Sequence, residues 1–129
     1  MSNVANWDVA SIDTAGTITA NGGFVGDVTG QVFGAVGIYS TTAPAISVTV
    51  RYAFLDASSN AVAATLADGT QGQVITVTAT DVTGATTLVP ANLTGGATIT
   101  FTAVNDSVTL VFDVSSWKVV SLSGSAAVS

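Results

Sequence analysis

The chain has 129 residues, which is enough for one domain with a single hydrophobic core. It carries eight aspartates against one lysine and one arginine, so its net charge is −6, and two cations are too few to neutralise a row of nucleic acid phosphates. Histidine and cysteine are absent, which excludes a histidine-dependent triad and thiolate metal ligands. No segment approaches the roughly 20 apolar residues that span a bilayer, so we expect neither nucleic acid nor a membrane as partner.

The composition favours an all-β fold. Valine, threonine, alanine, serine and glycine are abundant, whereas helix formers with long side chains are nearly missing. The first residues lack the basic and apolar regions of a secretory signal, so we expect synthesis in a cytoplasm without export.

The first 21 residues contain a hairpin pattern around the turn-forming residues 13–16. Trp7 stands in this otherwise small and polar leader. A large aromatic side chain on an arm can anchor it in a neighbour's pocket, and an equally good interpretation is that Trp7 packs on its own domain.

Between residues 22 and 37, glycine recurs at every fourth position, from 22 to 34. Four is twice the period of a strand, so in an extended chain these glycines share one face and alternate there with larger apolar side chains. A glycine inside a strand costs about 0.5–1 kcal/mol relative to alanine and is usually kept where another backbone comes close. We therefore interpret residues 22–37 as a segment that packs against other copies of itself or a larger surface; a glycine-rich linker is the alternative. Together with Trp7, the candidate interface residues are Phe24, Gly26, Val28, Gly30, Val32, Gly34 and Val36.

The repeat ends before Thr41–Pro44, and residues 45–55 then alternate as in a half-buried strand. One predicted face carries Ile46, Val48, Val50, Tyr52 and Phe54, and the other carries Ser47, Thr49, Arg51 and Ala53. After a turn at residues 56–60, residues 61–66 fit either a strand or one helical turn, and residues 68–72 form another turn.

Short strands at close spacing follow, which is typical of a sandwich or barrel with tight turns. They are predicted at residues 73–80, 87–89, 97–102, 107–113 and 117–122. The sequence Asp-Val-Thr-Gly, which also occurs in the repeat, is predicted to close a hairpin at Asp81–Gly84. The predicted core consists of Ile75, Val77, Ile99, Phe101, Val108, Leu110, Phe112, Trp117 and Val119. We expect an antiparallel β-sandwich or barrel over residues 39–129, preceded by an extended arm at residues 1–38 that carries the Gly-x-Val-x repeat.

We expect no catalytic, cofactor-binding or metal-binding residues, and hence no enzyme. Asp27–Gly30 has one residue more than the Asp-Thr/Ser-Gly sequence of aspartic proteases. Aspartates can bind Ca²⁺, but no Asp-x-Asp spacing occurs here. Solvated turns explain four of the eight aspartates at least as well, namely Asp56, Asp68, Asp106 and Asp113.

Most of the chain outside residues 39–62 resembles modules of virion structural proteins of tailed bacteriophages. The similar stretches are residues 65–73, 90–101, 105–112 and 117–121, and residues 18–23 where they run into the glycine repeat. The resemblance implies a structural protein of a head decoration, head fibre or tail-associated kind, with no catalytic residues.

We expect a capsid decoration (cement) protein that binds the outer surface of a phage capsid and stabilises its lattice. Its partners would be the major capsid protein and two further copies of itself in a homotrimer. It would be made in the host bacterial cytoplasm and end in the virion. One alternative is a trimeric head-fibre or tail-associated protein, which would be elongated. Another is a carbohydrate-binding β-sandwich module, which would need an aromatic platform on its surface.

Overall fold

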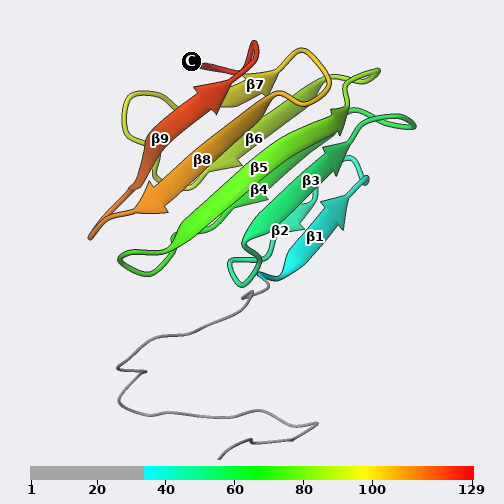
Figure 1. Cartoon of the computed structure of the whole chain (residues 1–129). Helices are drawn as coiled ribbons and strands as arrows, with labels where there is room; N and C mark the ends of the chain where they lie inside the picture. Colours follow the sequence, from blue (N-terminus) through cyan, green and yellow to red (C-terminus); the bar gives the residue numbers. More distant parts are fainter. Residues whose placement is uncertain (1–33) are drawn as a thin grey trace, which may run out of the picture. The chain divides into compact units, whose positions relative to one another are not determined.

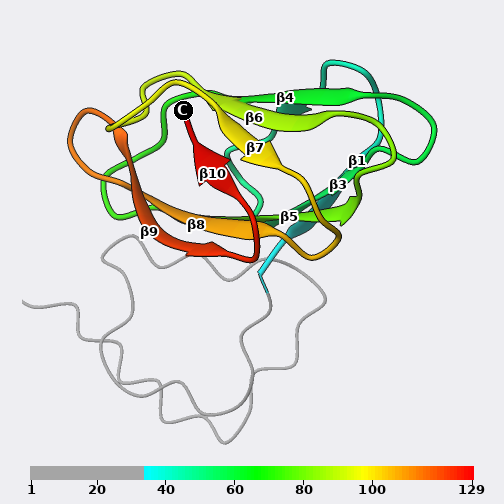
Figure 2. The same ribbon diagram turned by 90° about the horizontal axis from the view of Figure 1, so that it is seen from above.

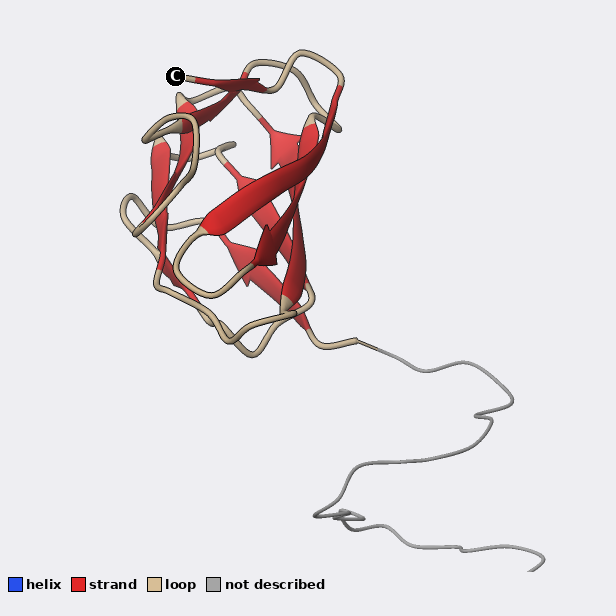
Figure 3. Ribbon diagram, turned by 90° about the vertical axis from the view of Figure 1, so that its left-hand side faces the viewer, coloured by secondary structure: helices blue, strands red, loops and turns tan. Residues whose placement is uncertain are grey.

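Two layers of β-strands form the part of the chain that the structure, a computed structural model, describes, which is residues 34–129 (Figures 1 and 2). Within this range there are ten strands and no helix, in two five-stranded sheets (Figure 3). The all-β prediction is therefore confirmed for these residues. The predicted hairpin around residues 13–16 and most of the glycine repeat lie outside the described residues.

The two sheets have strand orders β1-β3-β5-β8-β9 and β10-β7-β6-β4-β2. The first sheet consists of β1 (Val36–Tyr39), β3 (Tyr52–Asp56), β5 (Val74–Asp81), β8 (Ser107–Phe112) and β9 (Trp117–Ser123). The second sheet consists of β2 (Ala45–Ile46), β4 (Val62–Leu66), β6 (Thr86–Pro90), β7 (Ile99–Phe101) and β10 (Ala127–Val128).

Strand direction differs from the prediction. From β1 to β6 the chain alternates between the two sheets, so strands that neighbour each other within a sheet run parallel. Only the pairs that involve β7 to β10 are antiparallel. The prediction of antiparallel sheets is therefore wrong, since both sheets are mixed, and they do not close into a barrel. A two-residue hydrophobic period indicates which face of a strand is buried, but it does not specify the partner strand or its direction.

The stretch predicted as one strand over residues 45–55 is two strands in different sheets. A turn, in which the Val50 amide donates to the Ser47 carbonyl over 3.2 Å, separates β2 from β3. The alternation changes phase across this turn, so that Ile46 is buried before it, whereas Ala53 and Leu55 are buried after it. The predicted single apolar face is therefore wrong, because the turn carries the chain from one sheet to the other.

The segment Asp81–Gly84 does not close a hairpin either, since it joins β5 to β6 in the opposite sheet. The Asp81 carboxylate accepts a hydrogen bond from the Thr83 amide at 2.8 Å, which forms a local turn. Gly84 is required for close approach, because a Cβ there would lie 2.8 Å from the backbone of Asn60 and Ala61. Of the ambiguous residues 61–66, Val62–Leu66 form strand β4.

The core lies between the sheets. All predicted core residues are buried except Val119, which is partly buried against the cluster. Residues that the prediction did not include complete the core, namely Ile46, Ala53, Leu55, Ala57, Val62, Ala64, Leu66, Ala79 and Leu88. The alanines among them leave room for larger side chains from the facing sheet, as close packing requires.

Trp117 is the largest fully buried side chain and joins three segments. Its ring packs edge-on against Phe112 at a centroid distance of 5.2 Å, and its indole Nε1–H donates to the Ala67 carbonyl at 3.0 Å. Gly69 lies close to the ring, because a Cβ there would be 2.9 Å from the indole. Trp117 therefore holds the loop after β4 onto the core.

A buried carboxylate, Asp106, ties together the turn between β7 and β8 and the turn between β9 and β10. It accepts hydrogen bonds of 2.8 Å from the amides of Thr102, Ala103 and Ser125, and from the Ser125 hydroxyl. Burial raises the pKa of Asp106, but these four hydrogen bonds outweigh it and lower the pKa to about 2. Gly124 has a positive φ of 73° and lies so close to the carboxylate that a Cβ would overlap it.

We predict that Trp117→Ala lowers the free energy of unfolding by about 3–5 kcal/mol, because it empties a core site and leaves the Ala67 carbonyl without its donor. Urea unfolding followed by circular dichroism measures this loss. The control is Val114→Ala, whose side chain is 78% exposed and whose effect should stay within about 0.5 kcal/mol. A loss below about 1 kcal/mol for Trp117→Ala would contradict the packing described here.

We predict that acid destabilises the fold between about pH 4 and pH 2. The folded pKa of Asp106 is lowered to about 2 from an unfolded value near 3.9, so its contribution is complete above the unfolded value and is lost as pH falls through the folded one. Asp106→Asn should lower the melting temperature at pH 7 by about 10 °C or more, since an amide cannot accept from all four donors. The difference from wild type must shrink toward pH 2; a difference independent of pH would refute this role.

Candidate interaction surface

Two of the predicted interface residues, Gly34 and Val36, lie within the described range, at the start of the first sheet. The others lie outside it, namely Trp7, Phe24, Gly26, Val28, Gly30 and Val32. Their part in an interface stays a prediction. Strand β1 also includes residues 36–38 of the segment predicted as an arm, and pairs them with β3.

An exposed apolar surface lies at the β1 edge of the first sheet, where β1 and β3 run side by side (Figure 1). Val36 pairs with Tyr52 and Ile38 pairs with Phe54 in the parallel register. The side chains of Val36 and Ile38 are 57% and 73% exposed, Tyr52 is 40% exposed and Phe54 is partly buried. We call these four residues the β1/β3 patch. Exposed valine and isoleucine on an edge strand favour association with another chain.

Gly34, which precedes β1, and Gly37, within β1, leave space that other side chains of the chain occupy. A Cβ at Gly34 would lie 2.7 Å from Cδ of Arg51, and a Cβ at Gly37 would lie 2.7 Å from the Tyr39 ring. The Tyr39 hydroxyl accepts a hydrogen bond from the Ser47 amide at 3.0 Å, which fixes the ring over Gly37. At these two positions the glycine space is therefore filled by side chains of the same chain.

Arg51 borders the patch and is the chain's single arginine. Its guanidinium lies 5.8 Å from the centre of the Tyr52 ring, a cation–π arrangement. The patch therefore combines an apolar surface with one positive charge at its rim.

The opposite edge of the first sheet, β9, also exposes apolar side chains, with Val120 at 62% and Leu122 at 43% exposed. Lys118 on this strand forms an ion pair with Asp113, with Nζ 3.3 Å from Oδ2, and both side chains are nearly half exposed. An exposed pair of this kind contributes at most about 1 kcal/mol.

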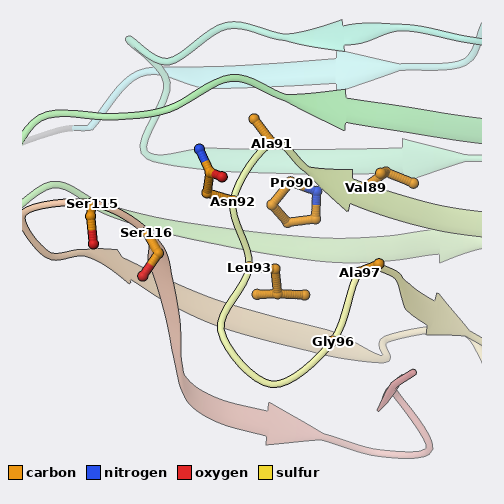
Figure 4. A pocket seen from close by; sticks show the side chains of 9 residues that line it. All are labelled: Val89, Pro90, Ala91, Asn92, Leu93, Gly96, Ala97, Ser115 and Ser116. Atoms are coloured by element: carbon orange, nitrogen blue, oxygen red, sulfur yellow. The ribbon is translucent and has the colours of Figure 1, made fainter.

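A hollow of about 520 Å³ lies between the loop after β6 and the turn after β8 (Figure 4). Its lining consists of Val89, Pro90, Ala91, Asn92, Leu93, Gly96, Ala97, Ser115 and Ser116. Val89, Pro90 and Leu93 supply the larger apolar side chains of this lining, whereas Asn92 and the two serines supply its polar groups.

The side chains of Asn92 and Ser116 at this hollow already have partners in the chain. Asn92 donates to both carboxylate oxygens of Asp68 at 2.9 and 2.8 Å. Thr94 and Ser116 are hydrogen-bonded at 2.9 Å, and Lys118 donates to the Thr94 hydroxyl at 2.6 Å. The arrangement connects β9 to two loops.

Asp113 belongs to the same network. The amides of Ser115 and Ser116 donate to its Oδ1 at 2.7 and 2.8 Å. These backbone hydrogen bonds, helped by Lys118 and opposed by partial burial, lower the pKa of Asp113 to about 2. The carboxylate therefore caps the turn between β8 and β9.

Over residues 34–129, no buried side-chain nitrogen or oxygen lacks a hydrogen-bond partner. In the same range, no three acidic side chains gather in a way that could hold a metal ion. The described residues also form no helix that is long and apolar enough to cross a membrane.

No family model matches the sequence of this chain, and no curated protein matches it.

Sequence reasoning did not include Ile38, Tyr52 and Phe54 in the interface. A signal for Ile38 was present, since it continues the even-numbered positions of the repeat that include Val36. Tyr52 and Phe54 could be assigned to the same surface only after the parallel β1–β3 register was known.

We predict that Gly37→Ala destabilises the fold by about 1–3 kcal/mol, because the added Cβ displaces the Tyr39 ring from its hydrogen bond to Ser47. Urea unfolding of Gly37→Ala, Tyr39→Ala and the double variant forms a cycle. In the Tyr39→Ala background, Gly37→Ala should cost much less. Equal costs in both backgrounds would show that the ring is not the obstacle.

Proposed function

We propose that this chain is a non-enzymatic structural protein of a tailed bacteriophage, which binds the outer surface of the capsid as a homotrimer and stabilises the shell lattice. The observation that carries the proposal is the β1/β3 patch, an exposed apolar surface on an edge strand that directly continues the glycine repeat. The similarity of residues 65–73, 90–101, 105–112 and 117–121 to phage virion modules supplies the biological setting.

The described body supports a structural role. Its buried polar side chains are satisfied within the chain, and its one polar network with a lysine is occupied in connecting loops. What the body offers to a partner is therefore its outer surface and its sheet edges. A cement protein needs a self-contained body and an additional segment that reaches a neighbour, and each copy then adds a modest binding energy to the lattice.

The β1/β3 patch favours an assembly role over a carbohydrate-binding role. Among residues 34–129, Tyr52 is the most exposed aromatic side chain, at 40%, and Phe101, Phe112 and Trp117 are buried. A stacking platform for sugars would require several exposed aromatic rings. A head-fibre or tail-associated protein is the other structural alternative, and it predicts a different location on the particle.

We predict that phage heads assembled without this protein release their DNA at a lower temperature than complete heads. DNA release is followed with a fluorescent dye during heating, and purified protein added back should restore the higher temperature in a saturable manner. The shell subunit should assemble normally in both cases, since the decoration acts after assembly.

Gold labelling of a tagged chain in electron micrographs locates the protein on the same particles. Label over the capsid supports decoration, whereas label on a fibre or tail supports the alternative. Equal release temperatures with and without the protein, together with unlabelled capsids, would refute the proposal.

A further inference from the structure

We infer that the free edge of β1, with the β1/β3 patch beside it, is the docking site for the glycine-repeat segment, residues 22–33, of a neighbouring copy of this chain. The inference rests on the self-association in the proposed function and not on capsid binding. The neighbour's segment would add to the first sheet as an extra strand next to β1, the mode in which backbone hydrogen bonds supply affinity and alternate side chains supply specificity.

The outer face of the first sheet changes character from one edge to the other. Paired residues across it run from Val36 and Tyr52 to Thr76 and Thr109, and a second row runs from Ile38 and Phe54 to Thr78 and Ser107. The threonines and serines are suited to water, and Thr76 and Thr109 are hydrogen-bonded to each other at 3.1 Å. In these two rows the apolar side chains belong to β1 and β3, at the edge where an added strand would cover them.

The larger apolar residues of the repeat are spaced so that, in an extended segment, their side chains lie on one face, as those of Val36 and Ile38 do in β1. Phe24, Val28 and Val32 share the even-numbered frame of Val36 and Ile38. In β1 this frame points to the exposed outer face, since both Val36 and Ile38 are more than half exposed. In the register that turns these positions outward, a repeat segment of another copy places its phenylalanine and valines on the same face, beside the patch.

The neighbour's segment fits better than the chain's own. The Ala35 carbonyl accepts hydrogen bonds from the amides of Arg51 and Tyr52 at 2.8 and 3.1 Å, and the Arg51 side chain covers Gly34. These contacts hold the backbone at Gly34 and Ala35, directly before β1. To reach its own patch, the segment would have to reverse before Gly34, and the turn would use residues of the repeat. A neighbour's segment needs no reversal.

Each copy then provides one edge and one segment, which is a heterologous interface. Such interfaces close into rings when the rotation between copies permits it, and a homotrimer is one such ring.

Cysteine cross-linking tests the docking directly, because the natural chain contains no cysteine. Single variants Val28→Cys and Ile38→Cys of the full chain are mixed and mildly oxidised, and we expect a mixed disulfide dimer as the main product. The matched control replaces Ile38→Cys by Val114→Cys, which is similarly exposed on the turn after β8 and should give little mixed dimer. The double variant Val28→Cys/Ile38→Cys is oxidised at high dilution. Rapid formation of a disulfide within one chain would show that the segment reaches its own edge and would overturn the inference.

Matched polar substitutions test the patch independently. Val36→Thr/Ile38→Thr should weaken self-association at least tenfold in sedimentation velocity, whereas Val114→Thr/Val120→Thr, which removes equally exposed valines, should leave it unchanged. Circular dichroism confirms that both variants fold. Equal association of both variants, or a monomeric natural chain, would overturn the inference. Natural chains that associate as expected but do not bind phage heads would refute only the capsid role.

Discussion

Each of the two sheets has one apolar face, and each face leaves water only by packing against the other. The rest of the described structure depends on this burial. Because the chain alternates between the sheets from β1 to β6, every second strand returns to the same sheet in the same direction, and neighbouring strands are parallel. Small residues such as Ala53 and Ala64 allow the layers to come together around the larger side chains.

The ends of this sandwich are held by polar groups. Asp106 collects four donors from two turns, Asp113 caps the turn after β8, and the indole N–H of Trp117 reaches the loop after β4. Carboxylates accept several hydrogen bonds each, so two aspartates satisfy backbone amides that the tight turns leave without strand partners. The chain therefore achieves an ordered body with few charges and no disulfide.

The order of the strands also determines which sheet edges stay open to a partner. In an open sandwich the sheets have edges, and the β1 edge of the first sheet combines unpaired backbone with exposed Val36 and Ile38. These exposed apolar side chains lie at the strand that follows the glycine repeat in the sequence. The proposed assembly role rests on this distribution of apolar and polar groups.

The sequence by itself determined the all-β class, the strands from β5 to β9 and most of their buried residues, because β-branched residues in a two-residue period specify a strand and its buried face. It also marked Gly34 and Val36 as unusual. Only the tertiary structure decided that residues 45–55 are divided between two sheets, that neighbouring strands among β1 to β6 run parallel, and that Tyr52 lies beside Val36. These features depend on which strands meet across long sequence separations, and a local periodicity carries no information about partner or direction.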